Sequence, residues 1–253
     1  MGATLGFGVD IGGSGIKGST VDLDAGKLHD ERIRIATPDP SKPDAVADVV
    51  KQIVGDFGWK GPVGITLPAV IKRGVAHTAA NIDKSWLGTD AAALFADRLG
   101  LAPEDVVVLN DADAAGIAEI RYGWPGDRDG VVVLLTFGTG IGSALFLDGR
   151  LVPNTEFGHL EVDGHDAETR AAASVKDDEG LSWAEWAQRV SRYIRGLEDL
   201  IWPDLVIAGG GVSKKADKWL PLLEVRTRVV PAELRNDAGI VGAAVAVREN
   251  LHG

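Results

Sequence analysis

Two glycine-containing stretches decide the fold: GVDIGGSGIKGSTVDLDAGKL at residues 8–28 and LLTFGTGIGSALFLDGRL at residues 134–151. Each runs from a β-like segment into a glycine cluster, returns through a second β-like segment and turns again at a Gly-basic-Leu triplet. Each also places a polar residue at the end of its first strand, Asp10 in one stretch and Thr136 in the other. This match predicts an internal duplication in which each half of the chain opens with a glycine-containing hairpin.

The segments around these hairpins alternate between helix-like and strand-like patterns. Apolar residues at helical spacing predict helices over residues 44–57, 90–99, 114–121 and 183–200 and a last helix from residue 238. Apolar and β-branched runs predict strands over residues 5–10, 16–23, 28–36, 63–67, 106–109, 131–136, 143–147, 150–152 and 205–208. We therefore expect an α/β protein with two domains, residues 1–113 and 114–237, and a helix at residues 238–253 that joins the first domain.

The composition excludes several classes of function. The 253-residue chain is 45% hydrophobic and 25% charged, has a formal net charge of −11 and contains no cysteine. The negative charge argues against binding to nucleic acid or to an anionic membrane, and the longest apolar runs are too short to span a bilayer. The lack of cysteine removes disulfides and cysteine-zinc sites. Together with the lack of a secretory signal pattern at the start, it fits a cytoplasmic protein.

The two glycine clusters leave two interpretations open. A dinucleotide-binding loop would lead from a strand into a helix, whereas both clusters lead into strands, and no Walker motif occurs in the chain. Glycine lets backbone N–H groups approach phosphate oxygens closely, and Ser14, Thr136, Thr139 and Lys17 could add donors and charge. A matched pair of phosphate-binding loops and a pair of ordinary tight hairpins remain as alternatives.

A second candidate site lies where the buried strand at residues 106–109 ends in Asn110-Asp111. Ligands of open α/β sheets bind at the carboxyl ends of the strands, so the Asp111 carboxylate could face a substrate. The alternative is a structural role, because Asp111 or Asp113 could cap the helix that follows. Of these two, we expect Asp113 to be the cap.

The third candidate is the polar segment NTEFGHLE at residues 154–161. It gathers the amide of Asn154, the carboxylates of Glu156 and Glu161 and the imidazole of His159 within eight residues. Such groups can donate and accept hydrogen bonds to the neighbouring hydroxyls of a sugar. A structural histidine and a metal site are the alternatives, and the lack of cysteine and of a second histidine at ligand spacing disfavours zinc.

These motifs resemble the ROK family of repressors, open reading frames and kinases, within the actin-like sugar-kinase superfamily, and most of all its polyphosphate-using members. The resemblance runs through FGVDIGGSGIKG (7–18), NIDKSW (81–86), LNDADAAG (109–116), LLTFGTGIGSALF (134–146), LVPNTEFGHLEV (151–162) and WPDLVIAGGGVSKKADKW (202–219). It implies the two-domain actin-like, ribonuclease H-like fold with an active-site cleft between the domains. It also implies transfer of a phosphoryl group to the 6-hydroxyl of glucose.

The resemblance further implies residue roles, with Asp111 as the general base. The residues expected to bind glucose are Asn81, Asn110, Asp111, Glu156, His159 and Glu168, and Glu161 competes with Glu168 for the last position. The residues expected to bind phosphate are Asp10, Gly12, Gly13, Ser14, Gly15, Lys17, Thr136, Gly138, Thr139 and Gly140. Among them, Asp10 is the expected Mg²⁺ residue, acting through water.

Inorganic polyphosphate is the expected phosphoryl donor, with ATP as a further donor. The superfamily builds its adenine slot at a triple glycine such as Gly209-Gly210-Gly211, whereas polyphosphate needs a basic track, for which Lys84, Lys214, Lys215 and Lys218 are the candidates. A solvated helix face is the alternative for these lysines. A strictly ATP-dependent hexokinase acting on glucose, mannose or an N-acetylhexosamine, and a catalytically silent sugar-binding relative, are the alternative functions.

Two departures from the family pattern matter. ROK proteins usually carry a cysteine-rich zinc motif after the Gly-His pair, and its absence implies that His159 binds no metal. Mg²⁺ is the metal that the resemblance implies. The usual Pro-Gly after the strand at residues 63–67 is replaced by Pro68-Ala69, so the turn could differ. The family also leads us to expect a homodimer whose partners are glucose and the donor, without nucleic acid or membrane.

Overall fold

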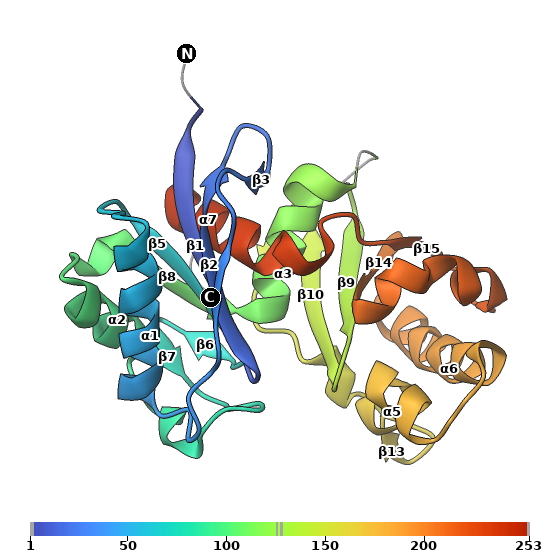
Figure 1. The fold of residues 1–253 in the computed structure, drawn as a ribbon. Helices are drawn as coiled ribbons and strands as arrows, with labels where there is room; N and C mark the ends of the chain where they lie inside the picture. Colours follow the sequence, from blue (N-terminus) through green and yellow to red (C-terminus); the bar gives the residue numbers. More distant parts are fainter. Residues whose placement is uncertain (1–2, 125, 127–128, 252–253) are drawn as a thin grey trace. The chain divides into compact units, whose positions relative to one another are not determined.

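The computed structural model describes residues 3–124, 126 and 129–251, and the chain divides into two compact units (Figure 1). The first unit is Met1–Tyr122 together with Asp237–Gly253, and the second unit is Gly123–Asn236. The division thus falls after Tyr122 instead of near Asp113, where the sequence led us to expect it. The reason is that the helix beginning at Asp111 packs within the first unit.

A six-stranded sheet forms the centre of the first unit. Its strands are β1 (Leu5–Gly12), β2 (Gly15–Asp22), β3 (Lys27–Leu28), β4 (Ile33–Ile35), β5 (Val63–Leu67) and β8 (Val106–Asn110). The order is β3-β2-β1-β5-β8, with β4 also paired to β2. β1 runs antiparallel to β2 and parallel to β5, which is in turn parallel to β8.

Helices cover both faces of this sheet. Alternate residues such as Phe7, Val9 and Ile65 are fully buried in a core with α1 (Pro43–Asp56) and α2 (Ala91–Leu99). On the opposite face α3 (Asp111–Ala118) and α7 (Ala238–Glu249) pack against each other and against β5 and β8. A Cβ on Gly8 or Gly64 would overlap a carbonyl oxygen of α7, so the two glycines allow this helix to lie directly on the sheet.

Two expectations about the first unit need correction. The strand expected at residues 28–36 is two short strands, because β3 and β4 pair with different parts of β2. Hydrogen bonds that Ser19 and Thr20 donate to Asp30 hold the backbone between these two strands. The last helix, expected to extend to residue 253, ends at Glu249, where Asn250 adopts φ +55°. Residues 252 and 253 lie outside the described residues.

The second unit repeats the same sheet. Its strands are β9 (Val131–Phe137), β10 (Ile141–Leu147), β11 (Arg150–Val152), β14 (Leu205–Gly210) and β15 (Arg228–Pro231). The order β11-β10-β9-β14-β15 matches that of the first unit, with an antiparallel hairpin followed by two parallel strands. The internal duplication predicted from the two glycine-containing stretches is therefore confirmed, while β15 was not predicted.

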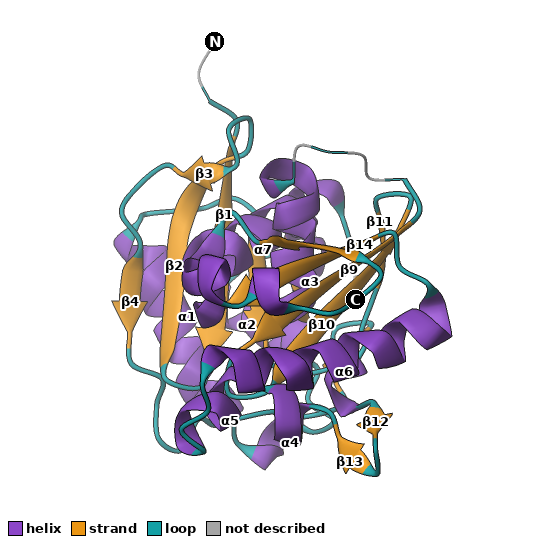
Figure 2. Ribbon diagram, turned by 90° about the vertical axis from the view of Figure 1, so that its right-hand side faces the viewer, coloured by secondary structure: helices purple, strands orange, loops and turns teal. Residues whose placement is uncertain are grey.

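The main helix of the second unit is α6 (Trp183–Ile201), which begins with a capping box between Ser182 and Glu185. One side of α6 buries Trp186, Tyr193 and Leu197 against the sheet residues. Figure 2 shows α4 (Glu168–Ala171) and the hairpin of β12 (Glu161–Val162) and β13 (His165–Asp166) beside α6, in agreement with their contacts.

The remaining described elements are short: α5 (Ala173–Asp178), β6 (Ile71–Lys72), β7 (Val75–Ala76), η1 (Lys84–Trp86), η2 (Pro103–Asp105), η3 (Glu119–Gly123), η4 (Phe157–His159), η5 (Gly211–Lys218), η6 (Leu220–Leu222) and η7 (Arg235–Asp237). None of the described helices combines the length and the apolar character that crossing a membrane requires.

Candidate functional site

Asp10 lies near the end of β1, directly opposite Lys17 of β2. Both of its carboxylate oxygens have partners: Oδ1 accepts a hydrogen bond from Thr66 Oγ1 at 3.0 Å, and Oδ2 pairs with Lys17 Nζ at 3.2 Å. Gly239, in the first turn of α7, lies so close that a Cβ there would be 3.0 Å from Asp10 Oδ1. The side chain is 18% exposed, so the carboxylate is held in place but remains accessible.

The first glycine loop is the tight turn between β1 and β2, in which Gly12 and Gly15 form the last residue pair. The backbone oxygen of Ser14 accepts a hydrogen bond from Arg34 Nη2 at 3.0 Å, and Gly15 leaves room for this guanidinium. A Cβ on Gly13 would lie 3.1 Å from the backbone oxygen of Asn81, so the structure brings this predicted glucose residue to the loop.

Arg34 is a cation of this loop that sequence reasoning missed. It lies on β4 and pairs across the sheet with Lys17, so two basic side chains stand beside the first glycine loop. The available signal was its place in the strand predicted at residues 28–36, but only the register of β4 on β2 shows which residue it faces.

Asn110 and Asp111 have different roles at the end of β8. The Asn110 Oδ1 atom accepts hydrogen bonds from the backbone N–H groups of Ala112 at 2.8 Å and Asp113 at 3.2 Å, which makes Asn110 the N-cap of α3. Its Nδ2 donates to the backbone oxygen of Ala69 at 3.2 Å. The expectation that Asp113 caps the helix is wrong, because the helix begins earlier and Asp113 is buried within it. Asp111, the predicted base, is exposed.

The second glycine loop joins β9 to β10. The N–H of Gly138 donates to the backbone oxygen of Gly140 at 2.9 Å, and the N–H of Ile141 donates to Glu168 Oε2 at 3.1 Å. Glu168 therefore holds the loop through this hydrogen bond. Gly140 leaves room for the Glu168 carboxylate, which a Cβ at position 140 would overlap. The parallel pairing of β14 with β9 places Gly209 beside Thr136 and the triple glycine next to this loop.

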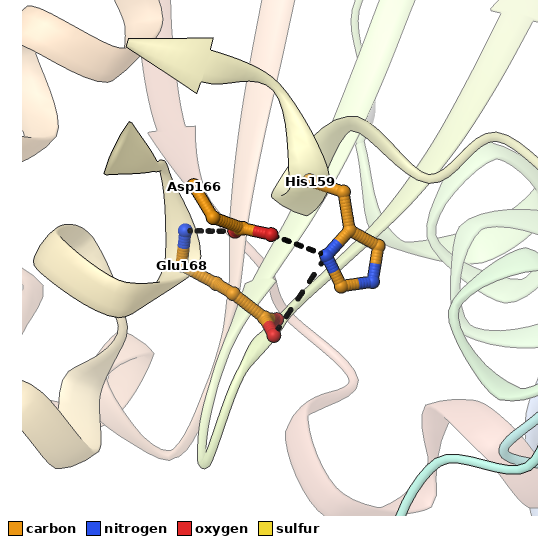
Figure 3. Close-up of side chains that lie close together, drawn as sticks. All are labelled: His159, Asp166 and Glu168. Carbon is orange, nitrogen blue, oxygen red and sulfur yellow. Dashed lines mark hydrogen bonds and ion pairs between the residues drawn. The ribbon is translucent and has the colours of Figure 1, made fainter. Parts of the chain in front are cut away.

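His159, Asp166 and Glu168 form a cluster in the second unit (Figure 3). His159 Nδ1 lies 2.9 Å from Asp166 Oδ2 and 3.9 Å from Glu168 Oε1. Asp166 is itself anchored, because its Oδ1 accepts a hydrogen bond from the backbone N–H of Glu168 at 3.2 Å. The ring of His159 is 57% exposed, so the face away from Asp166 is accessible to a ligand.

The electrostatics of this cluster raise two pKa values. The hydrogen bond that His159 donates to Asp166 raises the pKa of the imidazole. Partial burial opposes this shift, and the charges of Glu168, Asp166 and Glu156 add to it. Burial raises the pKa of Glu156, which the charge of His159 lowers and that of Glu168 raises. A carboxyl and an imidazole that lie close together with shifted pKa values are typical of a binding or catalytic site.

The segment that carries Glu156 and His159 is fixed to β10. Ser143 Oγ donates to the backbone oxygen of Thr155 at 2.6 Å and accepts from the backbone N–H of Phe157 at 2.9 Å. A Cβ on Gly158 would overlap the backbone oxygen of Ile141, so the segment can approach the strand only with glycine at this position.

Several predicted residues lie elsewhere. Glu161 is exposed on β12 and is outside the three-residue cluster, so the geometry favours Glu168 over Glu161 for a role beside His159. Lys84 belongs to η1 of the first unit, whereas Lys214 and Lys215 belong to η5 of the second. Asp166 was missed by sequence reasoning; its only signal was an acidic residue shortly after a predicted polar segment.

Asp10 and the cluster of His159, Asp166 and Glu168 offer different ligand atoms to a metal ion. Asp10 offers a hard carboxylate beside a glycine loop, which suits Mg²⁺ bound through one carboxylate and substrate phosphates. His159, Asp166 and Glu168 offer three potential ligand atoms within 4.8 Å of one another. In the second cluster, however, the hydrogen bond to Asp166 already occupies Nδ1 of the imidazole. On the imidazole, Nε2 is therefore the nitrogen left for another ligand.

A cavity of about 260 Å³ lies in the second unit beside α6, between Val162, Arg170, Arg189 and Tyr193 among others. None of the predicted site residues lines it. The charge and hydrogen-bonding capacity that a sugar and a phosphate require lie instead on the exposed groups of the predicted site.

Comparison with known proteins places these features in a family. The sequence model of the ROK family matches residues 6–174. The polyphosphate glucokinase of Mycobacterium tuberculosis (strain CDC 1551 / Oshkosh) is 58% identical over 248 residues, which cover 98% of this chain and 93% of the relative.

Solved structures agree. The inorganic polyphosphate/ATP-glucomannokinase from Arthrobacter sp. strain KM superimposes with a TM-score of 0.90 at 51% identity, covering 99% of this chain and all of its own. A ROK family glucokinase from Streptomyces griseus, in complex with glucose and AMPPNP, gives a TM-score of 0.81 at 25% identity and covers 98% of this chain and 100% of its own. The predicted actin-like fold class is confirmed by these neighbours.

Proposed function

Because the chain belongs to the ROK family, we propose that it transfers a phosphoryl group from inorganic polyphosphate to the 6-hydroxyl of glucose. The observation that carries this proposal is the 58% identity, over 98% of the chain, to a polyphosphate glucokinase. The exposed carboxylate at the end of β8 and the two glycine loops supply the groups that this chemistry needs.

Asp111 is the proposed general base. Its carboxylate accepts the proton of the 6-hydroxyl as the sugar oxygen bonds to the terminal phosphorus. The bond from that phosphorus to its bridging oxygen then breaks, leaving glucose 6-phosphate and a polyphosphate that is one phosphate shorter. Asn110 holds the start of α3 in place, which fixes the position of the base.

Glucose is proposed to bind through Asn81, Asn110, Asp111, Glu156, His159 and Glu168. His159 would use Nε2, the ring nitrogen that Asp166 leaves free. Glu168 has a second task in this scheme, because it also holds the N–H of Ile141 and thereby the second glycine loop. A change in Glu168 should therefore affect both sugar and phosphate binding.

The phosphates are proposed to lie on the two glycine loops. Backbone N–H groups there, the hydroxyls of Thr136 and Thr139 and the cations of Lys17 and Arg34 position the anion and neutralise its charge. Asp10 is the residue that would hold Mg²⁺, and the ion when bound supplies further charge neutralisation on the phosphates. We propose no zinc for His159.

The test is glucose 6-phosphate formation with Mg²⁺, measured in separate reactions with polyphosphate and with ATP. Turnover with polyphosphate is the expected result, and turnover with ATP alone would replace the donor in the proposal. A lack of product with both donors across several hexoses would leave a catalytically silent sugar-binding protein as the better account.

A broader substrate range is the second candidate. It is favoured by the Arthrobacter relative, which is named for both polyphosphate and ATP as donors and for glucose and mannose. We propose that mannose and ATP be used as well, which the same assay tests by exchanging one substrate at a time. A cytoplasmic location, supported by the lack of cysteine, and a homodimer without nucleic acid or membrane partners complete the proposal.

A further inference from the structure

Two lysines from different segments of the second unit converge on one tryptophan ring. Lys176 of α5 places its Nζ 4.4 Å from the centre of the Trp183 ring, and Lys215 of η5 places its Nζ 5.9 Å from the same centre. Both distances are within the range of cation–π attraction. The residues Lys176, Trp183 and Lys215 are called here the Trp183 cluster.

The Trp183 cluster is joined to the second glycine loop by short segments. Ser174 donates from its N–H to the backbone oxygen of Gly138 at 3.0 Å and from its Oγ to that of Thr139 at 2.8 Å, and Lys176 follows two residues later. On the other side, Gly209 and Gly210 pair with Thr136 and Phe137 of β9, and η5 with Lys215 begins directly after them. Both lysines thus extend from segments that border the loop.

The charge of the cluster favours a polyanion. Two ammonium groups on one ring repel each other. Lys176 Nζ has an acidic partner in Asp177, whose Oδ1 lies 3.3 Å away. The Asp177 side chain is 79% exposed, so this pair is weak. Lys215 is exposed and lies against the ring. A chain of phosphates crossing the ring would neutralise both lysines at once.

We propose that the Trp183 cluster binds the phosphates of polyphosphate that lie beyond the group being transferred, an inference that rests on the proposed function. Trp183 holds both ammonium groups against one ring. Polyphosphate can extend from the loop to both lysines, whereas ATP carries only three phosphates. Chains too short to extend from the loop to the ring gain nothing from it.

The experiment measures KM and kcat for polyphosphates of graded length and for ATP, in the wild type and in Lys215→Gln. We expect the variant to raise KM for long chains by about three- to fivefold, the effect of losing one exposed charge pair, with kcat almost unchanged. KM for ATP and for the shortest chains should stay the same. Added salt should weaken long-chain binding less in the variant than in the wild type.

Four further variants sharpen the test. Lys60→Gln removes the same charge from an exposed position in the first unit and should leave every KM unchanged. Trp183→Leu should raise KM for long chains, and Lys176→Arg should keep it low because the charge and ring contact remain. If Lys176→Gln fails to fold, since its side chain is only 15% exposed, the exposed Lys215 variant still decides the question.

The outcomes separate the two claims. Equal KM values for long chains in the wild type and in Lys215→Gln, or an equal rise for ATP and for long chains, would overturn the role of the cluster while the proposed reaction stands. No turnover of the wild type with polyphosphate of any length would remove the proposed donor and the cluster's role together.

Discussion

The hydrogen bond between His159 and Asp166 makes a specific prediction about which ring nitrogen meets the sugar. An ionised carboxylate can only accept, so Nδ1 of His159 must donate to Asp166 Oδ2, 2.9 Å away. In the neutral ring Nε2 is then an acceptor, ready for the O–H of a glucose hydroxyl. Asp166→Asn removes this selection, because an amide can donate as well as accept.

The size of the effect follows from exposure. A charge-assisted hydrogen bond contributes about 1.5–3 kcal/mol when shielded, but the His159 and Asp166 side chains are 57% and 39% exposed, which reduces the pair to about 0.5–1 kcal/mol. That range corresponds to a rise of about two- to fivefold in KM for glucose. We expect kcat and KM for polyphosphate to change little, because neither the base nor the phosphate loops are touched.

The pH dependence gives the sign of the effect. Asp166 is the main cause of the raised pKa of His159, so Asp166→Asn should lower that pKa toward its ordinary value. Where neutral imidazole is the acceptor for glucose, kcat/KM falls as pH drops through this pKa, and the fall should move to lower pH in the variant. The stability that the protonated His159 gains from Asp166 is present below its ordinary pKa and is lost as pH rises through the raised pKa.

The assay combines kinetics with ¹⁵N NMR of histidine-labelled protein, in which His159 is assigned by its loss in His159→Gln. Asp163→Asn is the matched control, since Asp163 is in the same hairpin but pairs with Arg192. A dominant Nδ1–H form in the wild type that becomes mixed in Asp166→Asn is expected. An unchanged tautomer together with an unchanged KM for glucose would refute the reasoning.

Five other variants test separate parts of the structure. Asp111→Asn should lower kcat by about 10²–10⁴-fold while glucose still binds, as measured by initial rates and by calorimetry; near-normal turnover would remove Asp111 as the base. The hydroxyl of Tyr193 is buried without a hydrogen-bond partner among the described residues, and burial raises its pKa, which keeps it neutral. Tyr193→Phe should therefore increase the free energy of unfolding, measured in urea, by about 1 kcal/mol. Tyr122→Phe is the matched control, because the Tyr122 hydroxyl donates a hydrogen bond to the backbone oxygen of Leu23 at 2.6 Å. Loss of this bond should decrease the free energy of unfolding by about 1 kcal/mol. A change of the same sign in both tyrosine variants would contradict this account. Gly242→Ala would place a Cβ onto a carbonyl oxygen of α3, so it should decrease the free energy of unfolding by about 3 kcal/mol and lower the melting temperature. Gly55 lies in α1 with no atom near the position of an added Cβ, so Gly55→Ala should raise the melting temperature slightly.

The sequence was sufficient for the features that repeat locally. Alternating apolar residues and glycine clusters predicted both hairpins. The apolar spacing predicted α1, α2 and α6 close to their observed bounds and gave the correct start of α7. The cap of α3 was assigned to the wrong residue because Asn110 and Asp113 are both good caps. Only the end of β8 determines where the helix begins.

The features that depend on distant contacts could not be predicted. Arg34 meets the first loop because of the register of β4 on β2, and Asp166 meets His159 because a two-residue hairpin folds back. Neither residue stands out from other exposed charges in the sequence. β15 was missed because it is a short strand that ends in proline, so its pattern is too weak to separate from a loop.

The duplication also explains how one topology supplies two kinds of phosphate-binding group. Asp10 and Thr136 occupy equivalent positions at the end of the first strand of each hairpin. The neighbours of Asp10 are Lys17 and Thr66, which hold its charge in place. The neighbours of Thr136 are Gly142 and Gly209, which have no side chains that could cover its hydroxyl. A carboxylate needs partners to stay ordered, and a phosphate needs room to reach N–H groups. The same sheet position therefore presents a fixed charge in one unit and a hydroxyl in the other, and the two flanking residues differ accordingly.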